Sequence, residues 1–279
     1  MKNQTFKSTS RGLSWVAGAV AVLGTTVAQA QMTPIAATGW NAGMVEGTVN
    51  LDSTAFSYQS GAGTSWEFYT SALGGTGNYP VGGLPMGTTI TSASSTTQFA
   101  FQPTSAQENT AIMGAAGWGS FPASVTLNLN TPGGYTELAL MGLCFGAANQ
   151  ATFPNYSIYY ANLAPAQTGT ITLGNFNGNG ASGTAVALSS SSCIDFSGNG
   201  SSSPGYTGAT LWEMDIAVTD SSDPIASITL SNPGAYGGGS GDIFFALSGA
   251  AVTVPEPSSL ALAGMGLLTL VEIVRRRRS

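Results

Sequence analysis

The chain contains no histidine, and its basic residues are confined to its two ends. Residues 12–274 of the 279-residue sequence contain neither Lys nor Arg. Ser-His-Asp and Cys-His nucleophile systems need an imidazole base, and the usual histidine-containing zinc sites need imidazole ligands. Lysine bases and lysine-containing phosphate loops are excluded from the same stretch. Any catalysis there would therefore depend on carboxylates.

Positive charge is also missing from the body of the chain. Residues 31–253 hold eleven acids and no base, a formal charge of −11, whereas the whole chain has seven bases, thirteen acids and a net charge of −6. An anionic body repels nucleic acid and anionic lipid, because neither finds a cationic partner on it. We therefore expect no nucleic-acid partner. Hydrophobic residues make up 43% of the chain, which is enough to build a core.

The first 30 residues have the three parts of a secretory signal peptide. Three basic residues come first, then an apolar run at 13–27, then Ala28 and Ala30 as the small residues before a cleavage site. The basic residues are Lys2, Lys7 and Arg11. The pattern predicts a signal helix that is removed by a cut ahead of Gln31, with a retained N-terminal anchor as the alternative.

The C-terminus has a different three-part layout. Pro255, Glu256 and Pro257 precede a mostly apolar stretch at 258–274, which is at the short end of what spans a membrane as a helix. A basic tail follows, consisting of Arg275, Arg276, Arg277 and Arg278. Because arginines are costly to translocate, the tail should stay in the cytoplasm and leave the body outside. The layout predicts a C-terminal transmembrane helix in the inner membrane.

This C-terminal region, 254–279, resembles the PEP-CTERM sorting signal of Gram-negative bacteria. The resemblance implies that an exosortase recognises Pro255, Glu256 and Pro257, and that the protein associates with exopolysaccharide or biofilm matrix. It also implies export through the inner membrane, transient anchoring with the body outside the cytoplasm, and a final place at the cell surface or in the extracellular matrix. The alternative is an ordinary single-pass tail anchor.

The body, 31–253, shows the alternation of a β-protein and almost no helical periodicity. In 124–130 the residues Val125, Leu127 and Leu129 lie on one face, and a Pro-Gly-Gly turn leads into the next run. The candidate strands are 48–58, 66–70, 97–101, 124–130, 135–145, 153–160, 170–173, 184–188, 211–218, 225–230 and 243–247. Short strands without crossover helices predict an all-β fold, an antiparallel β-sandwich of jelly-roll type. The later strands also loosely resemble the jelly-roll ectodomains that often precede PEP-CTERM tails.

Two cysteines, Cys144 and Cys193, lie in the part expected to be exported. An even number of cysteines in an oxidising compartment favours a disulfide. Closing this loop would stabilise the fold by roughly 4 kcal/mol on the chain-entropy model. Two buried thiols are the alternative.

Carboxylates remain as the candidate chemistry. Glu213 and Asp215 share one face of a predicted strand, about 6.6 Å apart along it, which is near the spacing of a glycosidase pair. The opposite face is apolar, so both acids are expected on the solvent side of an ordinary half-buried strand. Asp220 and Asp223 are weak calcium candidates, since calcium takes carboxylate and carbonyl oxygens. Sugar-stacking candidates are Tyr156, Tyr159, Tyr160, Tyr206 and Tyr236.

The sequence therefore predicts an exported, exosortase-sorted surface or matrix protein that is not an enzyme and has no cofactor, with bound calcium as an open option. Two other functions stay open. One is a calcium-supported carbohydrate-binding module, and the other is a secreted glycan hydrolase that works through carboxylates.

Overall fold

A computed structural model describes most of the predicted body and short pieces of the C-terminus. The described residues are 31–47, 67–76, 81–103, 108–114, 121–145, 151–180, 184–190, 194–195, 208–233, 241–252, 266–267, 270 and 273–277. The predicted signal peptide, 1–30, and the sorting motif Pro255, Glu256 and Pro257 lie outside them, as does the predicted strand at 48–58. Tyr206 and Tyr236 also lie outside them.

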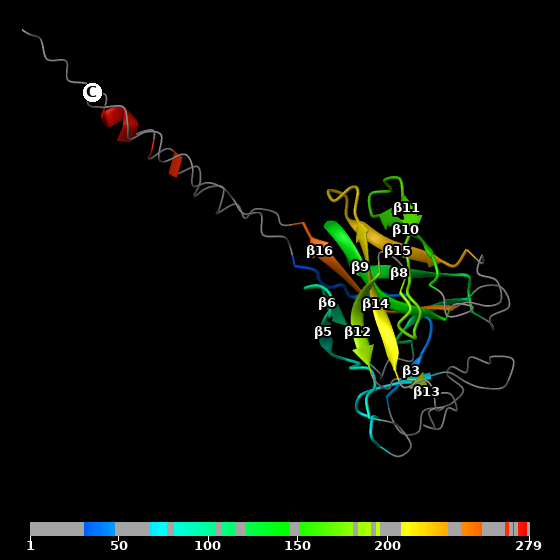
Figure 1. The fold of residues 1–279 in the computed structure, drawn as a ribbon. Helices are drawn as coiled ribbons and strands as arrows, with labels where there is room; N and C mark the ends of the chain where they lie inside the picture. Colours follow the sequence, from blue (N-terminus) through cyan, green and yellow to red (C-terminus); the bar gives the residue numbers. More distant parts are fainter. Residues whose placement is uncertain are drawn as a thin grey trace, which may run out of the picture.

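Two antiparallel sheets form the body (Figure 1). The first sheet has the order β1-β16-β9-β14-β12, and β7 pairs with β16 beside β1. Its strands are β1 (Thr33–Pro34), β7 (Ala111–Gly114), β9 (Tyr135–Phe145), β12 (Ala185–Ser190), β14 (Ala209–Ala217) and β16 (Gly241–Ala251). The second sheet has the order β11-β10-β15-β8-β2. Its strands are β2 (Ala37–Thr38), β8 (Ser124–Gly133), β10 (Asn155–Tyr160), β11 (Gln167–Thr170) and β15 (Ile225–Ser231).

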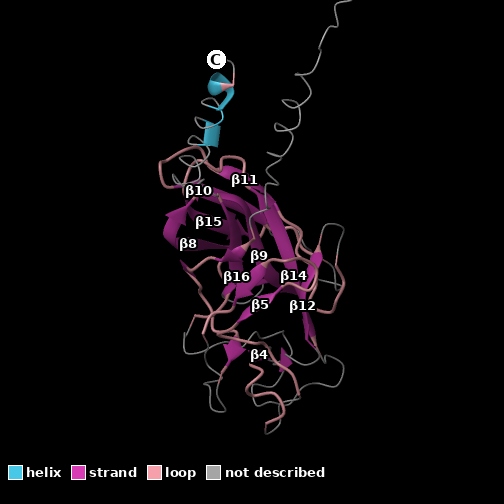
Figure 2. Ribbon diagram, turned by 90° about the vertical axis from the view of Figure 1, so that its left-hand side faces the viewer, coloured by secondary structure: helices cyan, strands magenta, loops and turns pink. Residues whose placement is uncertain are grey.

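Two smaller sheets complete the described structure. One joins β3 (Val45–Glu46), β4 (Glu67–Tyr69) and β13 (Ile194–Asp195), and its β3–β4 pair is parallel. The other is the hairpin of β5 (Thr89–Thr91) and β6 (Gln98–Ala100). Strands and loops make up nearly all of the fold, and the only helical turns in the described residues lie at the C-terminus (Figure 2).

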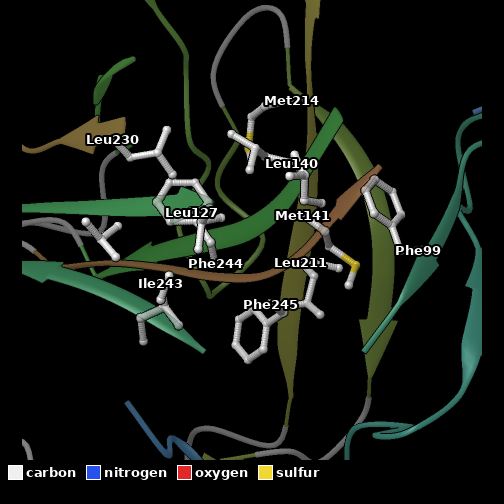
Figure 3. Close-up of a cluster of buried hydrophobic side chains, with 14 of the residues drawn as sticks. Phe99, Leu127, Leu140, Met141, Leu211, Met214, Leu230, Ile243, Phe244 and Phe245 are labelled. Atoms are coloured by element: carbon white, nitrogen blue, oxygen red, sulfur yellow. The ribbon is translucent and has the colours of Figure 1, made fainter. Parts of the chain in front are cut away.

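The two large sheets pack face to face through the alternating apolar residues of their strands. Val125, Leu127 and Leu129 of β8 are buried, while the residues between them are more exposed. They belong to one core cluster with Leu140 and Met214 of the first sheet, and Figure 3 shows Leu127, Leu140 and Met214 in this cluster. Because side chains alternate across a strand, one face of β8 reaches the core and the other faces solvent.

Strand β16 is buried on both faces. All its residues from Gly241 to Ala250 are buried. One face contacts the second sheet, and the other is covered by the segments that precede β7: Ser248 Oγ donates a hydrogen bond to the carbonyl of Gln98 at 2.5 Å, and Phe245 packs edge-on against Phe68 at 5.3 Å between ring centroids. This explains why residues 243–247 of the strand form a continuous apolar run and not an alternating one.

The structure confirms an all-β fold with antiparallel sheets. The predicted strand at 135–145 matches β9, and those at 124–130, 211–218 and 225–230 match β8, β14 and β15 within a few residues. The prediction at 170–173 is displaced, because β11 ends at Thr170, and within 171–173 only Leu173 takes part in an isolated bridge. Six short strands were missed, namely β1, β2, β3, β5, β7 and β13, because two to four residues are too few to show a period.

At the C-terminus, the described residues 266–267, 270 and 273–276 are helical. Arg275, Arg276 and Arg277 are exposed, and the backbone N–H of Arg277 donates to the carbonyl of Ile273 at 3.2 Å. Among the residues that the structure describes, no helix reaches the length and apolar character needed to cross a bilayer. Most of the predicted span 258–274 lies outside those residues.

Candidate functional site

Three carboxylates lie close together on the outer face of the first sheet. Asp215 of β14 pairs with Ala139 of β9, and Ala217 pairs with Glu137. Since residues two apart in a strand share a face, Glu137, Glu213 and Asp215 project from the same side of these two neighbouring strands. The sequence paired Glu213 with Asp215, but it contained no signal that would bring Glu137 to them.

Glu213 is buried, which contradicts the expectation that it faces solvent. Its side chain is only 2% exposed. The turn between β5 and β6 covers it, and the hydroxyls of Ser92 and Ser95 both donate to its carboxylate, Ser95 at 2.8 Å. The prediction failed because the outer face of this sheet is not a solvent face: a segment more than a hundred residues earlier in the chain packs across it.

Asp215 lies at the edge of this cover, and its side chain is exposed. Partial burial, followed by the nearby carboxylates of Glu213 and Glu137, raises the pKa of Asp215 to about 6. When carboxylates lie close together and are partly removed from water, their repulsion favours protonation of one of them. The raised pKa of Asp215 therefore follows from its place at the edge of the buried region, beside two other carboxylates.

An open pocket of about 590 Å³ lies over these acids. It is lined by Gln31, Met32, Ser95, Thr96, Thr97, Glu137 and Asp215. The lining is polar on the side of the β5–β6 turn and acidic on the side of the sheet. Within the part of the chain that the structure describes, no three His, Cys, Asp or Glu residues are grouped as a metal site would require.

A second buried acid, Asp242, lies between the two large sheets. It is fully buried in β16, where Thr152 Oγ1 donates to its Oδ1 at 2.5 Å and Asn232 Nδ2 donates to its Oδ2 at 2.9 Å. Asn232 follows β15 and Thr152 precedes β10, so this carboxylate links the first sheet to the second. Burial raises the pKa of Asp242 to about 7, and the two hydrogen bonds oppose that rise. Sequence analysis gave this acid no role; its place directly before the apolar run at 243–247 was the available signal.

The calcium candidates Asp220 and Asp223 lie in the turn between β14 and β15. Asp220 Oδ1 accepts hydrogen bonds from the hydroxyl of Ser222 at 2.6 Å and from its backbone N–H at 3.2 Å. The hydroxyl bond is the main cause of a lowered pKa for Asp220. Asp220 Oδ1 thus helps to close a turn of the chain.

Cys144 is buried in β9, and its thiol donates to the carbonyl of Leu173 at 3.3 Å. Cys193 lies outside the described residues, so the disulfide stays a prediction. Of the tyrosines proposed for sugar stacking, Tyr160 is buried, Tyr156 is partly buried and Tyr159 is 47% exposed.

Comparison with known proteins bears on the C-terminus. A family model described as the PEP-CTERM protein-sorting motif matches residues 253–278. The chain ends in a PEP-CTERM sorting motif. No curated protein matches the chain.

The PEP-CTERM motif implies an exosortase-targeted protein of the cell surface or extracellular space. It also implies processing by an exosortase, and export with membrane-anchored sorting on the way to the surface. The match begins directly after β16 and Val252, so the sorting signal adjoins the last strand of the core. The carboxylate pocket and Asp242 belong to the body that this motif delivers.

Proposed function

We propose that this protein is a non-catalytic component of the cell surface or extracellular matrix, sorted by an exosortase and associated with exopolysaccharide. The observation that carries the proposal is the PEP-CTERM match at residues 253–278. A signal peptide cut after Ala30 opens the route, the span 258–274 holds the chain in the inner membrane, and the basic tail keeps its end in the cytoplasm.

The chemistry of the body supports a role without catalysis. Residues 12–274 supply no imidazole, amine or guanidinium side chain. Two of the best-placed acids are also engaged: Glu213 accepts from Ser92 and Ser95, and Asp242 is enclosed between the sheets. The body is then a stable anionic β-domain without cofactor. Consecutive strands that change sheet, such as β8 to β9 and β14 to β15, are consistent with a jelly-roll type of sandwich.

The sorting motif can be tested in the source organism by replacing Pro255, Glu256 and Pro257 with Ala. We expect full-length protein with its basic tail to accumulate in the membrane fraction and the amount in the matrix to fall about tenfold or more. The matched control replaces Asp223 and Pro224, which lie in the β14–β15 turn, with Ala. Mass spectrometry of the wild-type surface protein completes the test, since an intact tail that still carries Arg275–Arg278 would contradict exosortase processing.

One observation favours a second candidate, a glycan hydrolase that works through carboxylates. Glu137 and Asp215 line an open pocket, and the pKa of Asp215 is raised, as in a general acid. Glycan hydrolysis that is lost in Asp215→Asn and in Glu137→Gln, but kept in the exposed-acid control Glu108→Gln, would replace the leading proposal by this one.

A further inference from the structure

The pocket lined by Glu137 and Asp215 is bordered by Gln31, the residue that signal cleavage would make the first of the chain. Gln31 and Met32 line the pocket together with Glu137 and Asp215. A free α-amino group at Gln31 would therefore lie at the rim of an acidic pocket. No side chain in residues 12–274 supplies a cation of another kind.

The backbone from Met32 onward is held in place, which fixes where Gln31 lies. The carbonyl of Met32 accepts a hydrogen bond from the N–H of Gln98 at 3.0 Å, and the N–H of Ile35 donates to Leu247 at 2.9 Å. Between them, Thr33 pairs with Gly249 in β16. Residue 31 is one peptide away from this anchored segment, so its nitrogen has a short radius of movement around the pocket.

A cation in the pocket would reduce the repulsion between the acids around it. On the strands packed around it, the acids facing this side are Glu137 on β9 and Glu213 and Asp215 on β14. The β5–β6 hairpin has no ionisable residue, and the one acid of β16, Asp242, lies at the far end of that strand from Gly249. Partial burial and mutual repulsion raise the pKa of Asp215, and a cation between the acids would relieve that repulsion.

We propose that the α-ammonium group of Gln31, formed when the signal peptide is removed, binds in this pocket as an ion pair with Glu137 and Asp215. The inference rests on the predicted cut after Ala30, which is part of the proposed export route. Before cleavage the same nitrogen is an uncharged peptide amide. Processing thus adds one positive charge at the place where the body has three negative ones, and fastens β1 to the first sheet.

The sequence provides a specific probe for this amine. Residues 12–274 contain no lysine, so in the processed protein the α-amine is the single target of an amine-acylating N-hydroxysuccinimide ester. Only the neutral amine reacts, and an ordinary α-amino group has a pKa of about 7.7–8.0. Pairing with carboxylates raises the amine's pKa by about one unit or more, which slows acylation near pH 7.5.

The experiment uses the exported protein purified from the organism, and it begins with its N-terminal mass. We expect a start at Gln31 with an intact α-amine. The acylation rate at pH 7.5 is then expected to rise about tenfold in the double variant Glu137→Gln/Asp215→Asn, and to stay unchanged in Glu108→Gln, whose exposed side chain lies before β7.

The double variant should also convert Gln31 to pyroglutamate faster, with loss of ammonia, because that reaction needs the neutral amine as well. Circular dichroism confirms that the variants fold.

The outcomes separate the two steps of the inference. A start at another residue overturns the proposal through the cleavage prediction on which it rests. A start at Gln31 with equal acylation rates in the wild type and the double variant overturns the ion pair alone and leaves the export route intact. A wild-type Gln31 found wholly as pyroglutamate also overturns the ion pair, since the cyclised residue has no ammonium group.

Discussion

Asp242 is a carboxylate enclosed between two apolar sheets, and it should control how stability depends on pH. Its two hydrogen-bond donors, Thr152 and Asn232, are neutral, and burial raises its pKa from 3.8 to about 7. The folded state therefore binds more protons than the unfolded state between about pH 4 and pH 7. Stability linked to this group is highest below that window and falls as the pH rises through it.

We expect Asp242→Asn to flatten this dependence. The amide has the shape of the protonated acid, and its oxygen can still accept from Asn232 while its NH2 group donates to Thr152 Oγ1. Urea denaturation of the wild type should show the free energy of unfolding falling by on the order of a few kcal/mol between pH 4 and pH 8, and the variant should show a clearly smaller change. Equal pH slopes in the two proteins would contradict the assignment.

Glu213 is the second buried acid, and it offers a comparison of two substitutions. In Glu213→Gln an oxygen still accepts from Ser92 and Ser95, and the repulsion of Asp215 is removed, so we expect stability equal to or above that of the wild type. In Glu213→Ala both hydroxyls lose their acceptor under the β5–β6 turn. The Ala variant should therefore be about 1–3 kcal/mol less stable than the Gln variant by chemical denaturation. The reverse order would show that the carboxylate is not held as described.

At the scale of elements, the contact between the segment after β2 and strand β8 depends on one glycine. Gly39 has a φ of +97°, and a Cβ there would lie 2.0 Å from the carbonyl oxygen of Thr126. Gly87, before β5, has a φ of +71° but no atom closer than 4.0 Å. The two positions share the conformational cost of a side chain at positive φ and differ in the steric contact.

This pair makes a matched prediction. Gly39→Ala should lower the free energy of unfolding by about 1–3 kcal/mol more than Gly87→Ala does. The measurement is denaturation of both variants under the same conditions, with the wild type as reference. Equal losses would mean that the segment after β2 moves away from β8 at little cost.

Strands β8 and β14 show where alternation in the sequence correctly predicts which residues are buried. Strand β8 alternates because one face meets the core and the other meets water, and strand β14 alternates in its apolar residues Trp212, Met214 and Ile216. The opposite face of β14 was wrongly assigned to solvent because its residues are polar. A sequence pattern does not distinguish a buried glutamate such as Glu213 from one that is exposed to solvent. What distinguishes them is the cover from Ser92 and Ser95, which lie 121 and 118 residues away along the chain.

At the scale of the whole molecule, the body is a polyanion. Residues 31–253 contain eleven acids and no Lys, Arg or His, so no side-chain salt bridge within this body can oppose their repulsion. Salt screens repulsion between exposed charges over roughly 10 Å at 0.1 M ionic strength. Added salt should therefore stabilise this body, whereas it weakens a protein that is stabilised by surface ion pairs.

We expect the melting temperature of the body to rise when NaCl is increased from low concentration to about 0.5 M, by about 2–4 °C for each kcal/mol of repulsion removed. The control is the same titration at pH 4, where many of the acids are protonated and the effect of salt should shrink. A melting temperature that falls with added NaCl at pH 7.5 would contradict this account.

The sequence by itself determined the sorting motif of this protein and its all-β fold class. The sorting motif, the apolar stretch after it and the arginines are contiguous, and a family model recognises them from order alone. Strand alternation is equally local, because the period of two follows from the backbone. The tertiary structure decided the rest: it buried Glu213, linked the sheets through Asp242, and placed Gln31 beside Glu137 and Asp215. These features arise from desolvation and repulsion between residues far apart in the chain, and only the packing of the sheets brings such residues together.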